Sequence, residues 1–204
     1  MHQRHKEVSY HQLSFFATLV TQSGCLYVIE VETTSTSIAF GTQTEIGLNG
    51  GTQPQQVTVA DFNQDGKPDF VTACQDSNNL VYGLNQFTEN SSTPFNVSSP
   101  GDMNANNNVR WVTAGDLTGD DFPDLVSISY KQGGYNTIYA EVWVNKGMTD
   151  GTFNGFANPS GSTNTTFEVR NSHLMNGIMA TNAVIGDFDG DGYGAQSPSA
   201  GGTP

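Results

Sequence analysis

An acidic loop of similar spacing occurs three times along this chain of 204 residues. The first copy runs from Asp61 to Asp69, the second from Asp116 to Asp124, and the third begins at Asp187. Oxygen-bearing side chains stand at the first, third and fifth positions, and a glycine lies near the sixth. Ca²⁺ binds about six to eight oxygen atoms and needs a sharp turn in the loop that surrounds it. The spacing therefore favours one calcium ion in each loop, and its recurrence indicates a repeat architecture.

The expected ligands follow from the loop positions. Side-chain oxygens at positions one, three, five and nine come from Asp61, Asn63, Asp65 and Asp69 in the first loop, and from Asp116, Thr118, Asp120 and Asp124 in the second. The backbone carbonyl of Lys67 or Phe122 would complete each set, and Asp187, Asp189 and Asp191 would serve in the third loop. The second loop has Asp121 in place of the glycine, and the third has Ala195 in place of the final acid. The alternative for each loop is a solvated Asp-Gly turn without an ion.

Short apolar and β-branched runs flank the loops and end at Gly, Asn, Asp or Pro, as strands do. Such runs precede the loops at residues 57–60, 111–115 and 183–186, follow the first two loops at 70–73 and 125–129, and come after a polar turn at 80–84 and 138–144. The repeating unit is therefore strand, acidic loop, strand, turn and strand, with a fourth strand before the next unit. No run has a convincing helical period, so the sequence predicts an all-β fold.

The repeat divides the chain into four parts. Residues 55–109 form the first complete unit, 110–180 the second with a loop insertion from Met148 to Thr166, and 181–204 a truncated third unit with an irregular tail. Residues 1–54 have the same strand cadence without the acidic ligands, which indicates a degenerate repeat. The alternative for this end is a secretory signal peptide, with Arg4 and Lys6 before an apolar run at 13–20, followed by a partial blade.

The pattern Asp-x-Asn-x-Asp-Gly-x-x-Asp at residues 61–69, followed by an apolar strand, resembles the FG-GAP or VCBS repeat. Such repeats form the blades of the integrin α-chain β-propeller and of many secreted propellers and lectins. The resemblance covers most of residues 55 to 195 and implies a partial β-propeller of four-stranded antiparallel blades with calcium-binding loops. Propellers have about four to eight blades, and units of this length allow fewer than four here. We therefore expect the chain to be part of a longer protein, or to be completed by another chain.

Charge and composition limit the partners and the compartment. With 7 basic and 20 acidic residues, the net charge is −13, which argues against nucleic-acid binding. No run reaches the roughly 18 apolar residues that span a bilayer, so we expect no membrane segment in this chain. Glycosylation sequons at Asn90, Asn96 and Asn164 favour an extracellular, secreted or cell-surface location. Cys25 and Cys74 permit one disulfide, and the sequence leaves its formation open.

Familiar catalytic motifs are missing from the sequence, including the nucleophile elbow and the His-Glu-x-x-His zinc motif. We therefore expect a non-enzymatic module that binds a protein or carbohydrate ligand on a propeller face. The alternative is an accessory or partial domain of a secreted polysaccharide-acting enzyme. Tyrosines near turns are candidates for stacking on sugars or anchoring a partner: Tyr82, Tyr130, Tyr135 and Tyr139. Trp111 and Trp143 are expected in the blade core.

Overall fold

A computed structural model describes residues 18–19, 25–33, 38–88, 93–99, 102–105, 108–131, 137–158, 166–169 and 183–186. Every regular element within these ranges is a β-strand, which confirms the all-β prediction. All of the strand pairings there are antiparallel. In the same part of the chain, no helix is long and apolar enough to cross a membrane.

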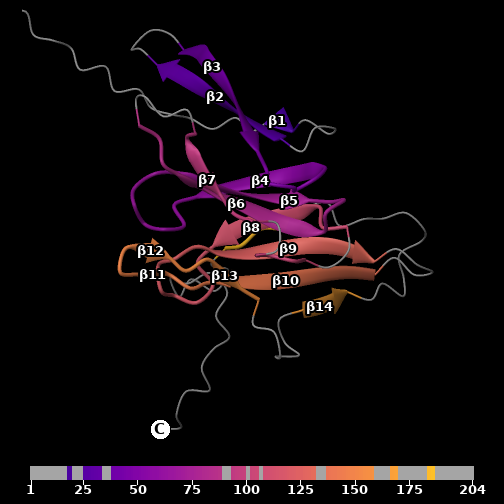
Figure 1. The fold of residues 1–204 in the computed structure, drawn as a ribbon. Helices are drawn as coiled ribbons and strands as arrows, with labels where there is room; N and C mark the ends of the chain where they lie inside the picture. The colour runs from indigo at the N-terminus through magenta and orange to yellow at the C-terminus, as the bar shows by residue number, and fades with distance from the viewer. Residues whose placement is uncertain are drawn as a thin grey trace, which may run out of the picture.

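Three sheets follow one another in chain order and lie one above the next (Figure 1). The first has the order β1-β2-β3 and consists of β1 (Thr18–Leu19), β2 (Cys25–Thr33) and β3 (Ile38–Gly47). The second is the four-stranded sheet β4 (Pro54–Ala60), β5 (Asp69–Cys74), β6 (Asn79–Asn85) and β7 (Phe95–Val97), in that order. The third contains β8 (Trp111–Gly115), β9 (Asp124–Lys131) and β10 (Thr137–Asn145). Both β13 (Phe156–Ala157) and β14 (Thr166–Val169) pair with β10.

The strand predictions for the two central units are confirmed. The runs at 57–60, 70–73, 80–84, 111–115, 125–129 and 138–144 lie within β4, β5, β6, β8, β9 and β10. The expected fourth strand is β7 in the first unit and β14 in the second, where it pairs with β10. Each unit is therefore an antiparallel sheet whose strands run up and down in sequence order.

Two predictions about connecting segments are wrong. Residues 183–186 lie outside any described strand. The predicted loop insertion from Met148 contains a hairpin of β11 (Met148–Thr149) and β12 (Thr152–Phe153), followed by β13. Asp150 and Gly151, both with positive φ, form the turn of this hairpin, while Phe153 and Phe156 pack into or against the core.

Buried apolar side chains join neighbouring sheets into one stack. The core between the second and third sheets consists of Phe62, Val71, Ala73, Leu80, Met103, Val109, Val112, Leu125, Trp143 and Phe156. The core between the first and second sheets consists of Leu26, Ile46, Leu48, Phe70, Cys74, Val81 and Phe95. Alternate residues of the fully buried β5 point to opposite faces, which is why Phe70 and Val71 belong to different cores. The second sheet is therefore covered on both faces.

Individual side chains refine the sequence predictions. Trp143 is buried in the core as expected, and its indole N–H donates to the Ser127 hydroxyl at 3.0 Å. Tyr130 is only 8 % exposed and packs with Ile128 and Ile138, so its predicted role on an open face is wrong. Neither Cys25 nor Cys74, both among the described residues, is joined in a disulfide. Tyr135 and the sequon residues Asn90 and Asn164 lie outside the described residues.

The packing of Gly83 on β6 generates a stability prediction. A Cβ atom at this position would lie 2.3 Å from Cε1 and 2.5 Å from Cζ of Phe70. The Phe70 ring is buried, so it has little room to move away. We expect Gly83→Ala to lower the free energy of unfolding by roughly 1–3 kcal/mol through overpacking. Urea denaturation measures this change. Gly47→Ala is the control, since nothing lies within 4 Å of its added methyl group, and an equal loss in both variants would contradict the prediction.

Candidate functional site

The two described acidic loops occupy equivalent places in neighbouring sheets. The first joins β4 to β5 and the second joins β8 to β9, so each connects the first and second strands of its unit. They lie side by side, because the amide of Gln64 donates a hydrogen bond to the backbone carbonyl of Asp121 at 3.1 Å. Asp187, Asp189 and Asp191 of the predicted third loop lie outside the described residues. The candidate site therefore consists of two adjacent loops.

In the first loop, Asp61 and Asp65 hold the turn. The Asp61 carboxylate accepts the backbone N–H of Asp65 at 3.0 Å and that of Gly66 at 2.8 Å. Asp65 in turn accepts the backbone N–H of Lys67 at 2.9 Å, and Asn63 accepts the N–H of Asp65 at 3.1 Å. These bonds satisfy amides that a tight turn would otherwise leave without partners. Three of the predicted side-chain ligands thus hold the turn through backbone amides.

The second loop repeats most of this scheme. Asp116 accepts the backbone N–H groups of Thr118, Gly119 and Asp121 at 3.1, 2.7 and 2.9 Å. Asp120 accepts the N–H of Phe122 at 3.0 Å, as Asp65 does for the residue two positions later in the first loop. Although partial burial opposes ionisation of Asp116, these amide donors outweigh it and lower its pKa below 3.8. Asp116 is therefore held in the ionised form that a cation requires.

The two loops also share their backbone conformation. Positive φ angles fall at position four, on Gln64 (57°) and Gly119 (77°), and at position six, on Gly66 (83°) and Asp121 (68°). Asp is among the few residues other than glycine that enter the left-handed region readily. The glycine therefore moves from position six to position four between the loops while the turn keeps its shape.

The acid at the ninth position is buried and braces the loop. Asp69 and Asp124 have no exposed surface. One oxygen of each accepts the N–H at loop position two, from Phe62 or Leu117, at 2.9 Å in both cases. The other oxygen accepts the backbone N–H of Asn85 at 2.7 Å or of Asn145 at 2.8 Å. Each acid thus ties the start of its loop to the end of the third strand.

Asn85 and Asn145 are hydrogen-bonding partners of the loops that the sequence did not reveal. Their side-chain amides donate to the carbonyls of Pro68 and Pro123 at 3.0 and 3.1 Å, just before the buried acids. Asn145 also donates to the carbonyl of Phe62 at 3.0 Å and so reaches the first loop from the second unit. The available signal was an asparagine at the end of the third apolar run in both units.

Burial controls the electrostatics of the ninth-position acids. Desolvation raises the pKa of Asp69 to about 6, opposed by the two amide hydrogen bonds and supported by the charges of Asp65 and Asp61. Burial raises the pKa of Asp124 in the same way, with further contributions from Asp120 and Asp116. Within each loop the carboxylates therefore repel one another, and a bound cation would relieve that repulsion.

The loops fit Ca²⁺ in donor chemistry and in turn conformation. All of the side-chain donors are oxygens, which hard cations prefer, and the left-handed residues supply the required sharp turn. Within the described ranges, however, no three His, Cys, Asp or Glu side chains are gathered as a metal-binding group. The carboxylate oxygens point to backbone amides instead, and each oxygen keeps a second lone pair for another partner.

The Asn145 bridge generates a mutational prediction. Asn145→Ala removes the two carbonyl contacts and the acceptor of the Gly147 N–H, which lies 2.8 Å away. We expect a loss of about 2–4 kcal/mol, because buried polar groups would remain unpaired. Urea denaturation should show a smaller loss for Asn85→Ala, whose side-chain hydrogen bonds in the described part of the chain stay within its own unit. Asn96→Ala, at an exposed strand position, is the control, and equal effects at Asn85 and Asn145 would contradict the proposed bridge.

Asp69 provides a test by titration. In the presence of chelator, its carboxyl ¹³C resonance should titrate with a midpoint of about 6. Because this pKa exceeds the ordinary value of 3.8, the folded chain holds the proton more tightly, and the contribution of Asp69 to stability falls as pH rises between the two values. Added Ca²⁺ should lower the midpoint by favouring the ionised form. Asp116, with its lowered pKa, is the internal control, and an Asp69 midpoint at or below 3.8 in chelator would refute the assignment.

One comparison with known proteins matches the part of the chain that contains these loops. A family model described as an FG-GAP-like repeat matches residues 61–127. The match starts at the first residue of the first loop and ends within β9, so it includes both described loops and the strands between them. No curated protein and no solved structure matches the chain. Residues 61–127 therefore carry the FG-GAP-like repeat that the sequence of the first loop resembles.

Proposed function

We propose that this chain is a calcium-stabilised part of an extracellular β-propeller and acts as a recognition module for a protein or carbohydrate ligand. The observation that carries the proposal is the equivalence of the two loops. They share hydrogen bonds at positions two, six, seven and nine and positive φ angles at positions four and six. Units that repeat in this way are typical of propellers, whose blades stack around an axis. The match to the FG-GAP-like repeat supports the same architecture.

The loops would use calcium for structure. Asp61, Asn63, Asp65, Asp69 and the Lys67 carbonyl would hold the ion in the first loop, and Asp116, Thr118, Asp120, Asp124 and the Phe122 carbonyl in the second. A bound ion supplies positive charge that offsets the mutual repulsion of the carboxylates. Because Asp69 and Asp124 each bond to the start of their loop and to the end of the third strand, fixing the loops also fixes the register of three strands. The third loop would contribute Asp187, Asp189 and Asp191 in the same manner.

The same geometry favours a non-catalytic role for the two acids at the ninth position. Asp69 and Asp124 have no exposed surface and use both oxygens on backbone amides. A general acid or base must instead reach the substrate within hydrogen-bonding distance. Recognition would therefore fall to side chains on the faces of the stacked sheets. Millimolar extracellular calcium would keep modest loops of this kind filled.

Thermal denaturation tests the proposal. With free Ca²⁺ at about 100 times the dissociation constant, each site adds about 2.7 kcal/mol to the free energy of unfolding. For a chain of this size, that gain corresponds to about 5–10 °C in Tm. We therefore expect chelator to lower the melting temperature and added Ca²⁺ to restore it. The absence of any shift in either direction would refute the calcium proposal.

Paired variants locate the effect in the loop. Asp65→Asn keeps an acceptor for the Lys67 N–H but removes one charge, so it should reduce the calcium-dependent gain in Tm. Asp76→Asn removes one charge from an exposed turn after β5 and is the matched control. An equal reduction in the two variants would assign the effect to net charge and not to the loop.

A further inference from the structure

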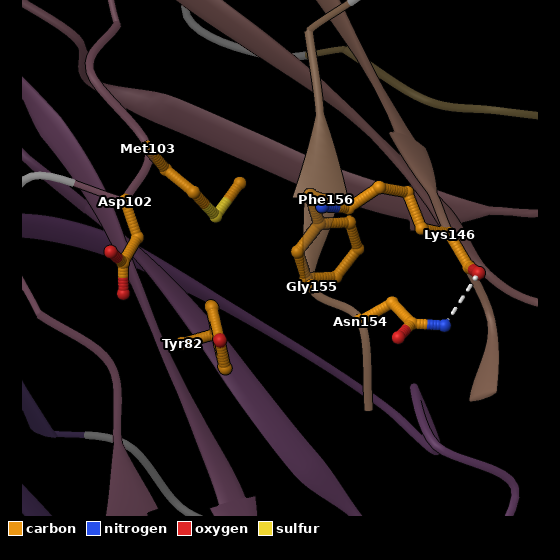
Figure 2. A pocket seen from close by; sticks show the side chains of 7 residues that line it. All are labelled: Tyr82, Asp102, Met103, Lys146, Asn154, Gly155 and Phe156. Atoms are coloured by element: carbon orange, nitrogen blue, oxygen red, sulfur yellow. Dashed lines mark hydrogen bonds between the residues drawn. The ribbon is translucent and has the colours of Figure 1, made fainter. Parts of the chain in front are cut away.

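A small cavity lies between the second and third sheets, apart from the acidic loops. It has a volume of about 210 Å³ and is open to solvent. Tyr82 on β6 and Asp102 after β7 lie on one side, and Lys146 and Asn154 lie on the other (Figure 2). Pockets for drug-sized ligands have volumes of about 300–1,000 Å³, so this smaller cavity suits a single small unit.

The polar groups of the cavity include both donors and acceptors. Both N–H groups of the Asn154 amide are used, on the Lys146 carbonyl at 3.2 Å and the Thr149 hydroxyl at 2.9 Å. Its Oδ1 is therefore available as an acceptor. Asp102 accepts the Ser99 N–H at 3.0 Å through Oδ2, which leaves Oδ1 as a second acceptor. The Lys146 ammonium is an exposed donor.

Tyr82 combines a hydroxyl group with an oriented aromatic surface. Its ring packs edge-to-face against Phe153 and Phe156, with centroid distances of 5.5 and 5.8 Å. Burial and the charge of Asp102 raise the pKa of Tyr82, so the hydroxyl keeps its proton at neutral pH. A Cβ at Gly155 would lie 3.6 Å from this hydroxyl, so the Tyr82 oxygen borders the glycine backbone. Tyr82 is thus held in place by its neighbours.

We propose that this cavity binds one neutral saccharide unit, an inference that rests on the proposed recognition function. Each sugar hydroxyl both donates and accepts, so it is matched by a site that offers an ammonium, a carboxylate, an amide oxygen and a phenol together. The apolar C–H groups of a sugar ring pack on an aromatic side chain such as Tyr82. This combination of groups lies within one cavity of single-unit size.

The charges that line the cavity favour a neutral ligand. Lys146 would attract an anion, but Asp102 and the net charge of −13 oppose it. Asp102 would attract a cation, which Lys146 opposes across the same cavity. A zwitterion such as a free amino acid is the competing ligand, because its two charges could face the two walls. The experiment therefore includes both classes.

Titration of the whole chain in calcium-containing buffer provides the test. The probes are the methyl glycosides of glucose, galactose, mannose and N-acetylglucosamine, with glycine and alanine as zwitterions, followed by two-dimensional NMR. We expect at least one glycoside to bind at millimolar concentration and to shift the amide signals around Tyr82 and Asn154. Tyr82→Phe, Lys146→Met and Asp102→Asn should each weaken that binding about tenfold, the loss of one good hydrogen bond. Tyr27→Phe, on β2 of the first sheet, and Asp76→Asn are matched controls outside the cavity and should leave the binding unchanged.

The outcomes separate this inference from the proposed function. Glycoside binding that survives all three cavity variants places the sugar on another surface and overturns the cavity assignment, while recognition of carbohydrate stands. The inference is also overturned if only the amino acids bind, or if the folded protein binds none of the probes. The calcium-dependent melting is measured independently of these probes. Tyr82→Phe keeps the ring that packs on Phe153 and Phe156, so its folding can be verified from the unchanged NMR signals of the core.

Discussion

The buried carboxylate at the ninth position of each loop is the interaction on which the architecture depends. Asp69 joins the N–H of Phe62 at the loop start to the N–H of Asn85 at the end of β6. Burying a charged group is unfavourable unless hydrogen bonds compensate, and these two bonds supply the compensation. The raised pKa of Asp69 shows that the compensation is incomplete. The same residue thus organises three strands and leaves a negative charge that a cation would stabilise.

Neighbouring units are coupled through the loops as well as through the core. The fully buried Phe62 packs edge-to-face on Phe156 at a centroid distance of 5.3 Å, and its carbonyl accepts the Asn145 amide. Gln56 on β4 likewise accepts the backbone N–H of Val112 on β8 at 2.9 Å. A change in the first loop therefore reaches the second unit by direct contacts. Through contacts of this kind between neighbouring units, an ion bound in one loop would stabilise the whole stack of sheets.

The central strands and the two loops could be predicted because local patterns determine them. Short apolar and β-branched runs bounded by turn residues identified β4, β5, β6, β8, β9 and β10. The segment from Met148 to Ala157 could not be assigned, since pairing with β10 and burial of Phe156 depend on tertiary contacts. Asn145 was missed for a similar reason, because its carbonyl partner Phe62 lies far away in the sequence. A strand at Ala183–Gly186 was predicted from composition alone, although a strand also needs a partner.

The second loop shows that a departure from the sequence pattern need not change the shape of the loop. Its departures from the pattern are Thr118 at position three and Asp121 at position six. At position six the backbone is left-handed in both loops, and its N–H bonds to the first aspartate at 2.8 or 2.9 Å. Asp121 meets both requirements, because an aspartate tolerates this conformation and its N–H is unchanged. At position three the change affects the ligand atom, because Thr118 offers a hydroxyl where Asn63 of the first loop offers an amide oxygen. A hydroxyl is a weaker ligand for a hard cation than an amide or carboxylate oxygen. The second loop therefore matches the first in shape, and the calcium proposal implies a weaker site in the second loop.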